Sequence, residues 1–107
     1  MAMTPDQERR AERLQARIDA AVSGLRYSPY LEVYGAPVQQ RFEEAARPGG
    51  LEGMERALDL FDHLVHTEDA AQVRYGLFLF LLHHAGLEKL GLRAPVRTPG
   101  PPPQDPR

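Results

Sequence analysis

The sequence predicts an all-α protein: a small bundle of about four helices, with an extended, Tyr- and Pro-containing connection after the first helix. Apolar residues recur at intervals of three and four in several stretches, and residues that start or end helices separate these stretches. The length of 107 residues allows a single domain. We expect residues 1–91 to form this domain and residues 92–107, rich in Pro and Arg, to be a disordered tail.

The first helix is expected to begin after Thr4 and to end near Gly24. Thr4 is a suitable N-cap, Pro5 suits the first helical position, and acidic residues follow in the first turn. One face of this helix is apolar and consists of Leu14, Ile18, Ala21 and Leu25. This stripe indicates an amphipathic helix that packs on a core.

The connection over residues 26–37 is expected to be extended rather than helical. Pro29, Gly35 and Pro37 argue against a regular helix there. A short helix is then expected over residues 38–47. Its buried side chains are predicted to be Val38, Phe42 and either Ala45 or Ala46.

Two longer helices are expected to complete the bundle. The first runs from Leu51 to about His66 and has an apolar face formed by Leu51, Met54, Leu58, Phe61 and Val65. Thr67 is predicted to be the N-cap of the second, in which residues 77–82 are all large and apolar. A helix that is apolar on every side is typical of a central element. Because Gly76 costs about 1 kcal/mol inside a helix, we expect another backbone to lie close to it.

The composition excludes several classes of protein. The formal net charge of −2 gives no electrostatic reason to expect nucleic acid as a ligand. Without cysteine the chain cannot form disulfides or Cys-based metal sites. The N-terminus lacks the apolar core of a signal peptide, and no apolar run reaches the roughly 20 residues that span a bilayer. We therefore expect a cytoplasmic protein without a membrane partner.

The four histidines are the best candidates for metal ligands. His63 and His66 are one helical turn apart, whereas His83 and His84 are adjacent and point in different directions. Neither a Glu-x-x-His nor an H-E-x-x-H pattern occurs. We therefore expect no metal and no cofactor, with His63 and His66 as weak candidates and a site across a dimer left open. The carboxylates lie at helix-surface spacings, so we expect no enzyme.

The arginines of the first helix are the best candidates for nucleic-acid contacts. They are Arg9, Arg10, Arg13 and Arg17. Asp6 and Glu12 lie at pairing distance along the helix and neutralise part of this charge. A helix-turn-helix interpretation is disfavoured by the acids of the later helix, which are Glu52, Glu55, Asp59 and Asp62. A solvated helix face is the favoured interpretation of both sets.

The all-round apolar last helix predicts a partner. About ninety packed residues are expected to leave part of this helix uncovered, and a second copy of the chain would cover it. The predicted interface consists of Val73, Leu77, Phe78, Phe80, Leu81 and Leu82. A further partner surface is predicted at Tyr27, Tyr30 and Tyr34, unless these side chains cap the bundle with their hydroxyls in water.

The leading hypothesis for function is a non-enzymatic protein–protein interaction module. It would be an adaptor, a regulator or a small subunit of an assembly, and would form a homodimer through its last helix. One alternative is a nucleic-acid-associated accessory protein that uses the arginines of the first helix and the basic tail. A second alternative is a bundle that binds a small molecule or a metal ion at the histidines or tyrosines.

Overall fold

The computed structural model describes residues 3–95, and all regular secondary structure in this range is helical. The elements are α1 (Pro5–Ala21), η1 (Pro29–Leu31), α2 (Glu32–Ala45), α3 (Gly50–Thr67), α4 (Ala70–His83) and η2 (Leu87–Leu90), where η denotes a short 3₁₀ helix. The predicted all-α bundle of about four helices is confirmed. The predicted disorder of residues 96–107 concerns a segment that lies outside the described residues.

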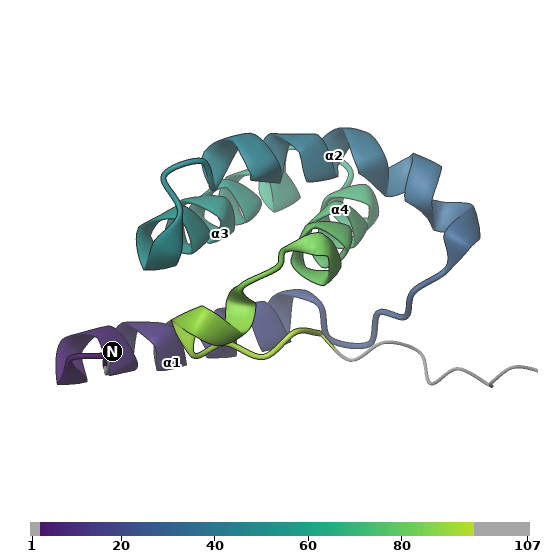
Figure 1. Cartoon of the computed structure of the whole chain (residues 1–107). Coiled ribbons are helices and arrows are strands. Elements are labelled where there is room, and N and C mark those ends of the chain that lie inside the picture. The colour runs from purple at the N-terminus through teal and green to yellow at the C-terminus, as the bar shows by residue number, and fades with distance from the viewer. Residues whose placement is uncertain (1–2, 96–107) are drawn as a thin grey trace, which may run out of the picture.

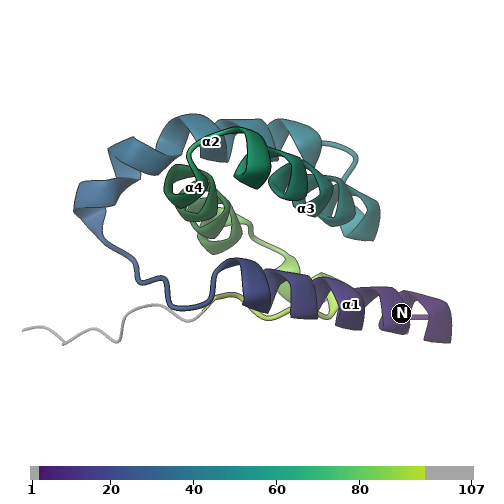
Figure 2. The same ribbon diagram turned by 180° about the vertical axis from the view of Figure 1, so that it is seen from behind.

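The central element of the bundle is α4. In two opposite views it lies between α1 on one side and the pair of α2 and α3 on the other (Figure 1, Figure 2). Both α2 and α3 pack against α4 and against each other. The last described residues return along α1, so the two ends of the described chain lie on the same side of α4.

The first helix starts and packs as the sequence predicts. The Thr4 hydroxyl accepts a hydrogen bond from the backbone N–H of Gln7 at 3.1 Å, and the Gln7 side chain accepts one from the Thr4 N–H at 2.9 Å. This capping box satisfies two donors that have no partner within the helix. The buried side chains of α1 include Leu14, Ile18 and Ala21. The helix ends at Ala21 rather than near Gly24.

The beginning of α2 differs from the prediction. Residues 32–37, expected to be extended, are helical, and Pro37 lies inside the helix. Pro37 has no N–H to donate to the carbonyl of Val33, four residues earlier. Val33 and Pro37 are both exposed, so that carbonyl lies on the side of the helix that faces water. Of the predicted connection over residues 26–37, only residues 26–28 lie outside helices.

Two glycines allow α2 and α4 to cross closely. A Cβ atom built on Gly76 would lie 2.6 Å from the Cβ of Val38, and one built on Gly35 would lie 2.9 Å from the Cδ1 of Leu79. Such distances are far below ordinary van der Waals contact, so neither position has room for a side chain. The predicted close approach of another backbone to Gly76 is confirmed, because the Gln39 nitrogen lies 3.1 Å from that Cβ position.

The boundary between α3 and α4 also differs from the prediction. Thr67 is the last residue of α3, and its hydroxyl donates to the carbonyl of His63 at 3.1 Å. The N-cap of α4 is Asp69, whose carboxylate accepts hydrogen bonds from the N–H groups of Ala71 at 3.0 Å and Gln72 at 3.4 Å. Thr and Asp are both favoured N-caps, but the Thr67 hydroxyl is engaged in the preceding helix.

The prediction that one chain is too short to cover α4 is wrong. The predicted interface residues Val73, Leu77, Phe78, Phe80 and Leu81 are each at most 1% exposed, and Leu82 is half-buried. Side chains from α1, α2, α3, η2 and the residue after η2 join them in one core, including Leu14, Phe42, Leu58, Leu87 and Leu92. Side chains that are already covered in this way present almost no area to a second copy.

The packed domain extends beyond its predicted end at residue 91. Gly91 adopts a left-handed backbone with φ of 77°, which turns the chain back after η2. Leu92 is consequently buried in the core. Arg93 is held against α1 as well, because its N–H donates to the Gln15 side chain and its guanidinium lies 3.1 Å from Asp19.

Candidate functional site

The arginines of α1 face the acids of α3. The Arg10 guanidinium donates two hydrogen bonds to the Glu55 carboxylate, at 2.6 and 3.0 Å. Arg17 lies 3.0 Å from Asp59 and 2.9 Å from Asp62. The two sets of charges were predicted as separate solvated faces, whereas in the fold they connect α1 to α3.

This pairing changes the interpretation of the predicted nucleic-acid contacts. Arg9 lies 3.7 Å from Asp6, and Arg10 and Arg17 bind acids of α3. Among these four arginines, only Arg13 makes no ion pair within residues 3–95. Neutralisation of several phosphates requires several available cations, and three of the four are already paired with carboxylates.

The Arg10–Glu55 pair shifts the pKa of both side chains. The hydrogen bond from Arg10, and then the charges of Arg10 and its neighbours, lower the pKa of the Glu55 carboxyl. The same hydrogen bond and the Glu55 charge raise the pKa of Arg10. Both side chains are about one-third exposed, so the pair is partly screened by solvent.

The histidines are distributed over the ends of α3 and α4. His63 and His66 are exposed on α3, and His84 stacks on Phe80 with ring centroids 5.3 Å apart. The His83 ring lies 2.9 Å from the carbonyl of Leu79. Within residues 3–95, no group of three or more His, Cys, Asp or Glu side chains is arranged to hold a metal ion.

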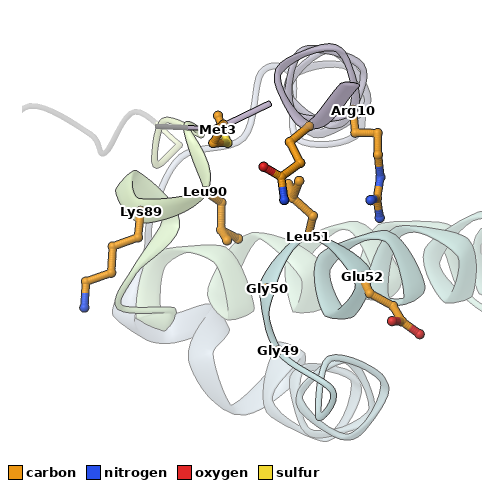
Figure 3. Close-up of a pocket in the computed structure, with 9 residues that line it drawn as sticks. Met3, Arg10, Gly49, Gly50, Leu51, Glu52, Lys89 and Leu90 are labelled. Atoms are coloured by element: carbon orange, nitrogen blue, oxygen red, sulfur yellow. The ribbon is translucent and has the colours of Figure 1, made fainter. Parts of the chain in front are cut away.

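A hollow of about 400 Å³ lies where the beginnings of α1 and α3 meet η2 (Figure 3). Leu51 and Leu90 point into the space between these elements, whereas Lys89 and Glu52 extend away from it on opposite sides. Arg10 also lines the hollow, but its guanidinium is bound to Glu55. The labelled charged groups are therefore either turned away from the hollow or already paired.

The exposed large apolar side chains of residues 3–95 are concentrated in one short segment. They are Tyr30 (91% exposed), Val33 (84%), Leu31 (40%) and Tyr34 (37%). All four lie at the junction of η1 and α2. Scattered single apolar residues are normal on a protein surface, but a contiguous group is typical of an interaction site.

The spacing of this segment places an apolar face on the outside of α2. Tyr30, in η1 directly before α2, is three residues from Val33 and four from Tyr34, and Pro37 follows these two at the same spacings, so the four residues lie on one side of this helical segment. We call these four residues the outer face of α2. A different side of the same helix is buried and carries Gly35, Val38 and Phe42. The first turns of α2 are thus apolar on two sides, and residues 3–95 cover only one of them.

Hydrogen bonds from tyrosine hydroxyls hold the outer face in place. The buried Tyr75 hydroxyl accepts a hydrogen bond from the Ser28 N–H at 2.7 Å and donates one to the Ser28 carbonyl at 3.1 Å. The Tyr27 hydroxyl donates to Glu32 at 2.5 Å. These contacts fix the chain on both sides of η1, so the outer face is presented by a rigid support rather than by a loop.

Tyr34 connects the outer face to the beginning of α4. Its hydroxyl donates to the Asp69 carboxylate at 3.1 Å, and its carbonyl accepts a hydrogen bond from the Gln72 side chain at 2.9 Å. Partial burial, and then the hydrogen bond to Asp69 and the charge of that carboxylate, raise the pKa of the Tyr34 phenol. Two carboxylates are therefore bound by tyrosines at or beside the outer face: Glu32 by Tyr27, and Asp69 by Tyr34.

The three tyrosines that the sequence predicts as a partner surface differ in their exposure. Tyr30 is almost fully exposed, Tyr34 is exposed at its edge, and Tyr27 is half-buried. Sequence reasoning missed Val33 and Pro37, because it assigned this segment an extended conformation. Their spacing from Tyr30 is the signal that would have identified them in a helix.

None of the helices between residues 3 and 95 combines the length and the apolar character that a bilayer crossing requires. Comparisons with protein-family models, curated proteins and solved structures find no match to this chain.

Proposed function

We propose that this protein is a non-enzymatic interaction module that binds a protein segment through the outer face of α2. The single observation that carries the proposal is the second apolar side at the beginning of α2. Tyr30 and Val33 are exposed there because no other element of residues 3–95 covers them. Tyrosine is enriched in protein interfaces, because its ring supplies contact area and its hydroxyl tolerates water.

The size of the face favours a short segment over a second folded subunit. A stable interface buries about 800 Å² on each partner and involves about 20–30 residues a side. The outer face has four residues, and α4, the other predicted interface, is covered by its own chain. An extended peptide needs only a few anchoring side chains, so it suits a face of this size.

A capture experiment with matched variants tests this proposal. The full chain, immobilised at its N-terminus, is compared with a variant that carries Tyr30→Ser and Val33→Ser. The control carries Glu12→Ser and Glu88→Ser, two exposed positions on other elements. Proteins retained from an extract of the native host are quantified for all three baits, and circular dichroism verifies that each bait is folded.

The proposal expects one protein to be retained by both the wild-type chain and the control. The Tyr30→Ser/Val33→Ser variant should retain at least tenfold less of this protein, which corresponds to about 1.4 kcal/mol of binding energy. Equal retention by all three folded baits would contradict the proposal. Size-exclusion chromatography with light scattering of the wild-type chain decides whether a second copy occupies the face. A dimer that Tyr30→Ser/Val33→Ser dissociates would replace the peptide partner by a homodimer.

A further inference from the structure

We propose that the outer face of α2 binds the proline-rich segment of the same chain, residues 96–107. This inference rests on the proposed function, because both use the same face. Tyr30, in η1, and Tyr34, in the first turn of α2, offer two exposed rings four residues apart along the chain, and Val33 lies between them in the sequence. Proline-rich segments bind aromatic surfaces of this kind in the polyproline II conformation, whose formation loses little entropy.

The sequence of residues 96–107 has the features that such a surface requires. Five of these twelve residues are proline. Pro99 and Pro102 are three residues apart, and Pro103 and Pro106 repeat this spacing. Because a polyproline II helix has about three residues per turn, each pair presents its rings on one side and can contact two neighbouring tyrosines.

The charges of the two partners are complementary. Glu32 and Asp69 each accept a hydrogen bond from a tyrosine at or beside the outer face, and Asp69 also accepts two from the backbone of α4. A carboxylate has about four acceptor sites, so Glu32 retains most of its capacity for a cation and Asp69 retains about one site. Residues 96–107 carry Arg97 and Arg107 against a single acid, Asp105.

The described chain ends within reach of the outer face. Pro95 lines a hollow together with Ser23 and Leu25, and both views show the coloured ribbon ending beside the connection between α1 and α2 (Figure 1, Figure 2). The chain from Leu25 to Tyr30 spans at most about 17 Å. Residues 96–107 in polyproline II form would extend over about 37 Å, so the segment is long enough to reach the face and lie along it.

Attachment to the domain makes a small contact area sufficient. A short linker gives a tethered segment an effective concentration in the millimolar range. A contact that is too weak for a free peptide at micromolar concentration is therefore populated within the chain. A second copy of the chain has no such advantage, and the four residues of the outer face fall short of a dimer interface.

Paramagnetic relaxation enhancement on the full chain tests the contact. The protein has no cysteine, so Gln104→Cys gives a single site for a nitroxide label. The amide signals of residues 30–34 are compared with those of residues 50–52, which lie beyond the opposite end of α2, a helix about 21 Å long. Millimolar affinity and millimolar effective concentration make the contact about half populated, so signals of residues 30–34 should weaken at least about twofold, and those of residues 50–52 much less.

Two matched variants make the result specific. Tyr30→Ser/Val33→Ser in the labelled chain should restore the signals of residues 30–34, and so should the replacement of Pro101, Pro102 and Pro103 by Gly. The proposal is overturned if residues 30–34 are not weakened, or if the weakening persists in both variants. Weakening in a mixture of isotope-labelled chain without nitroxide and unlabelled chain with nitroxide would assign the contact to a second copy and would also overturn it.

The outcomes separate this inference from the proposed function. If the nitroxide leaves residues 30–34 unaffected while Tyr30→Ser/Val33→Ser still abolishes partner capture, only the inference fails. If the nitroxide weakens these signals but the capture of proteins is unaffected by the variant, the proposed function fails and the segment is the occupant of the face.

Discussion

Gly76 lies so close to Val38, where α4 passes under α2, that a Cβ atom built on it would lie 2.6 Å from the Val38 Cβ. This contact sets the distance between the central helix and the helix that presents the outer face. Glycine inside a helix costs about 1 kcal/mol relative to alanine, and at this crossing the close packing of two backbones offsets that cost. The exposed outer face is thus supported by a tightly packed crossing on its opposite side.

Replacing Gly76 by Ala should destabilise the protein in spite of the better helix propensity of alanine. The new methyl would meet the Val38 Cβ and the Gln39 backbone nitrogen, neither of which can move without shifting α2. We expect a loss of about 2 kcal/mol in the free energy of unfolding, as for other overpacked cores. Gly35→Ala is the comparison, because its two nearest atoms belong to side chains. Urea unfolding should therefore show a smaller loss for Gly35→Ala, and the reverse order would contradict this account of the crossing.

Tyr75→Phe should destabilise the segment that leads into the outer face. The substitution leaves the Ser28 N–H and carbonyl without the hydroxyl that now serves both. An unsatisfied, partly buried backbone group costs about 1–3 kcal/mol, and we expect about 1 kcal/mol in thermal unfolding. Tyr30→Phe is the matched control, because the exposed Tyr30 hydroxyl has no hydrogen-bond partner within residues 3–95. Equal effects of the two substitutions would show that the Tyr75–Ser28 contact contributes nothing.

Asp69→Ala should remove the N-cap of α4 at a cost of about 1 kcal/mol, whereas Thr67→Ala should have a much smaller effect. The sequence alone assigns the cap to Thr67, so this pair of variants distinguishes the two assignments. Asp69→Ala should also lower the pKa of the Tyr34 phenol, because it removes a hydrogen bond and a negative charge that raise it. Ultraviolet difference titration of the tyrosines measures this shift. A larger loss for Thr67→Ala would restore the sequence-based assignment.

The Arg10–Glu55 pair should make stability depend on pH in the acid range. The pKa of Glu55 is lowered in the folded chain, so the unfolded chain takes up its proton at higher pH. The stabilisation is therefore present above the ordinary carboxyl pKa and is lost as the pH falls through the lowered value. Glu55→Gln should reduce the melting temperature by a few degrees at pH 7, and the difference from wild type should vanish in acid. The control Glu12→Gln should leave the melting temperature unchanged at both pH values. An effect of Glu55→Gln that does not depend on pH would contradict the stabilising role of the Arg10–Glu55 pair.

Local sequence rules predict the core because the spacing of apolar residues determines which of them share one face of a helix. Leu14, Met54 and Leu58 are buried as their spacing predicts, and the cap at Thr4 is correct. The same rules fail where packing against a neighbouring helix determines the conformation of the chain. Pro37 is tolerated inside α2, whose first turns pack on α4 through Gly35.

The candidate site could be predicted only in part for the same reason. The tyrosines stand out by residue type, but their different exposure depends on where α2 begins. Sequence spacing likewise cannot reveal that Arg17 of α1 and Asp59 of α3 face each other, since the two residues are far apart along the chain. The apolar character of α4 is evident from the sequence, whereas its coverage depends on how η2 and Leu92 return to the core.

The most direct test of the account replaces Tyr30 by the photoreactive amino acid p-benzoylphenylalanine in the native host. Position 30 lies at the centre of the proposed contact, and the same substitution at exposed Glu12 on α1 serves as the control. Irradiation should attach a defined protein segment, either a partner or residues 96–107, to position 30 and not to position 12. Mass spectrometry identifies the attached segment. A chain that forms no adduct at position 30, or the same adducts at both positions, would contradict the assignment of the outer face of α2 as the binding surface.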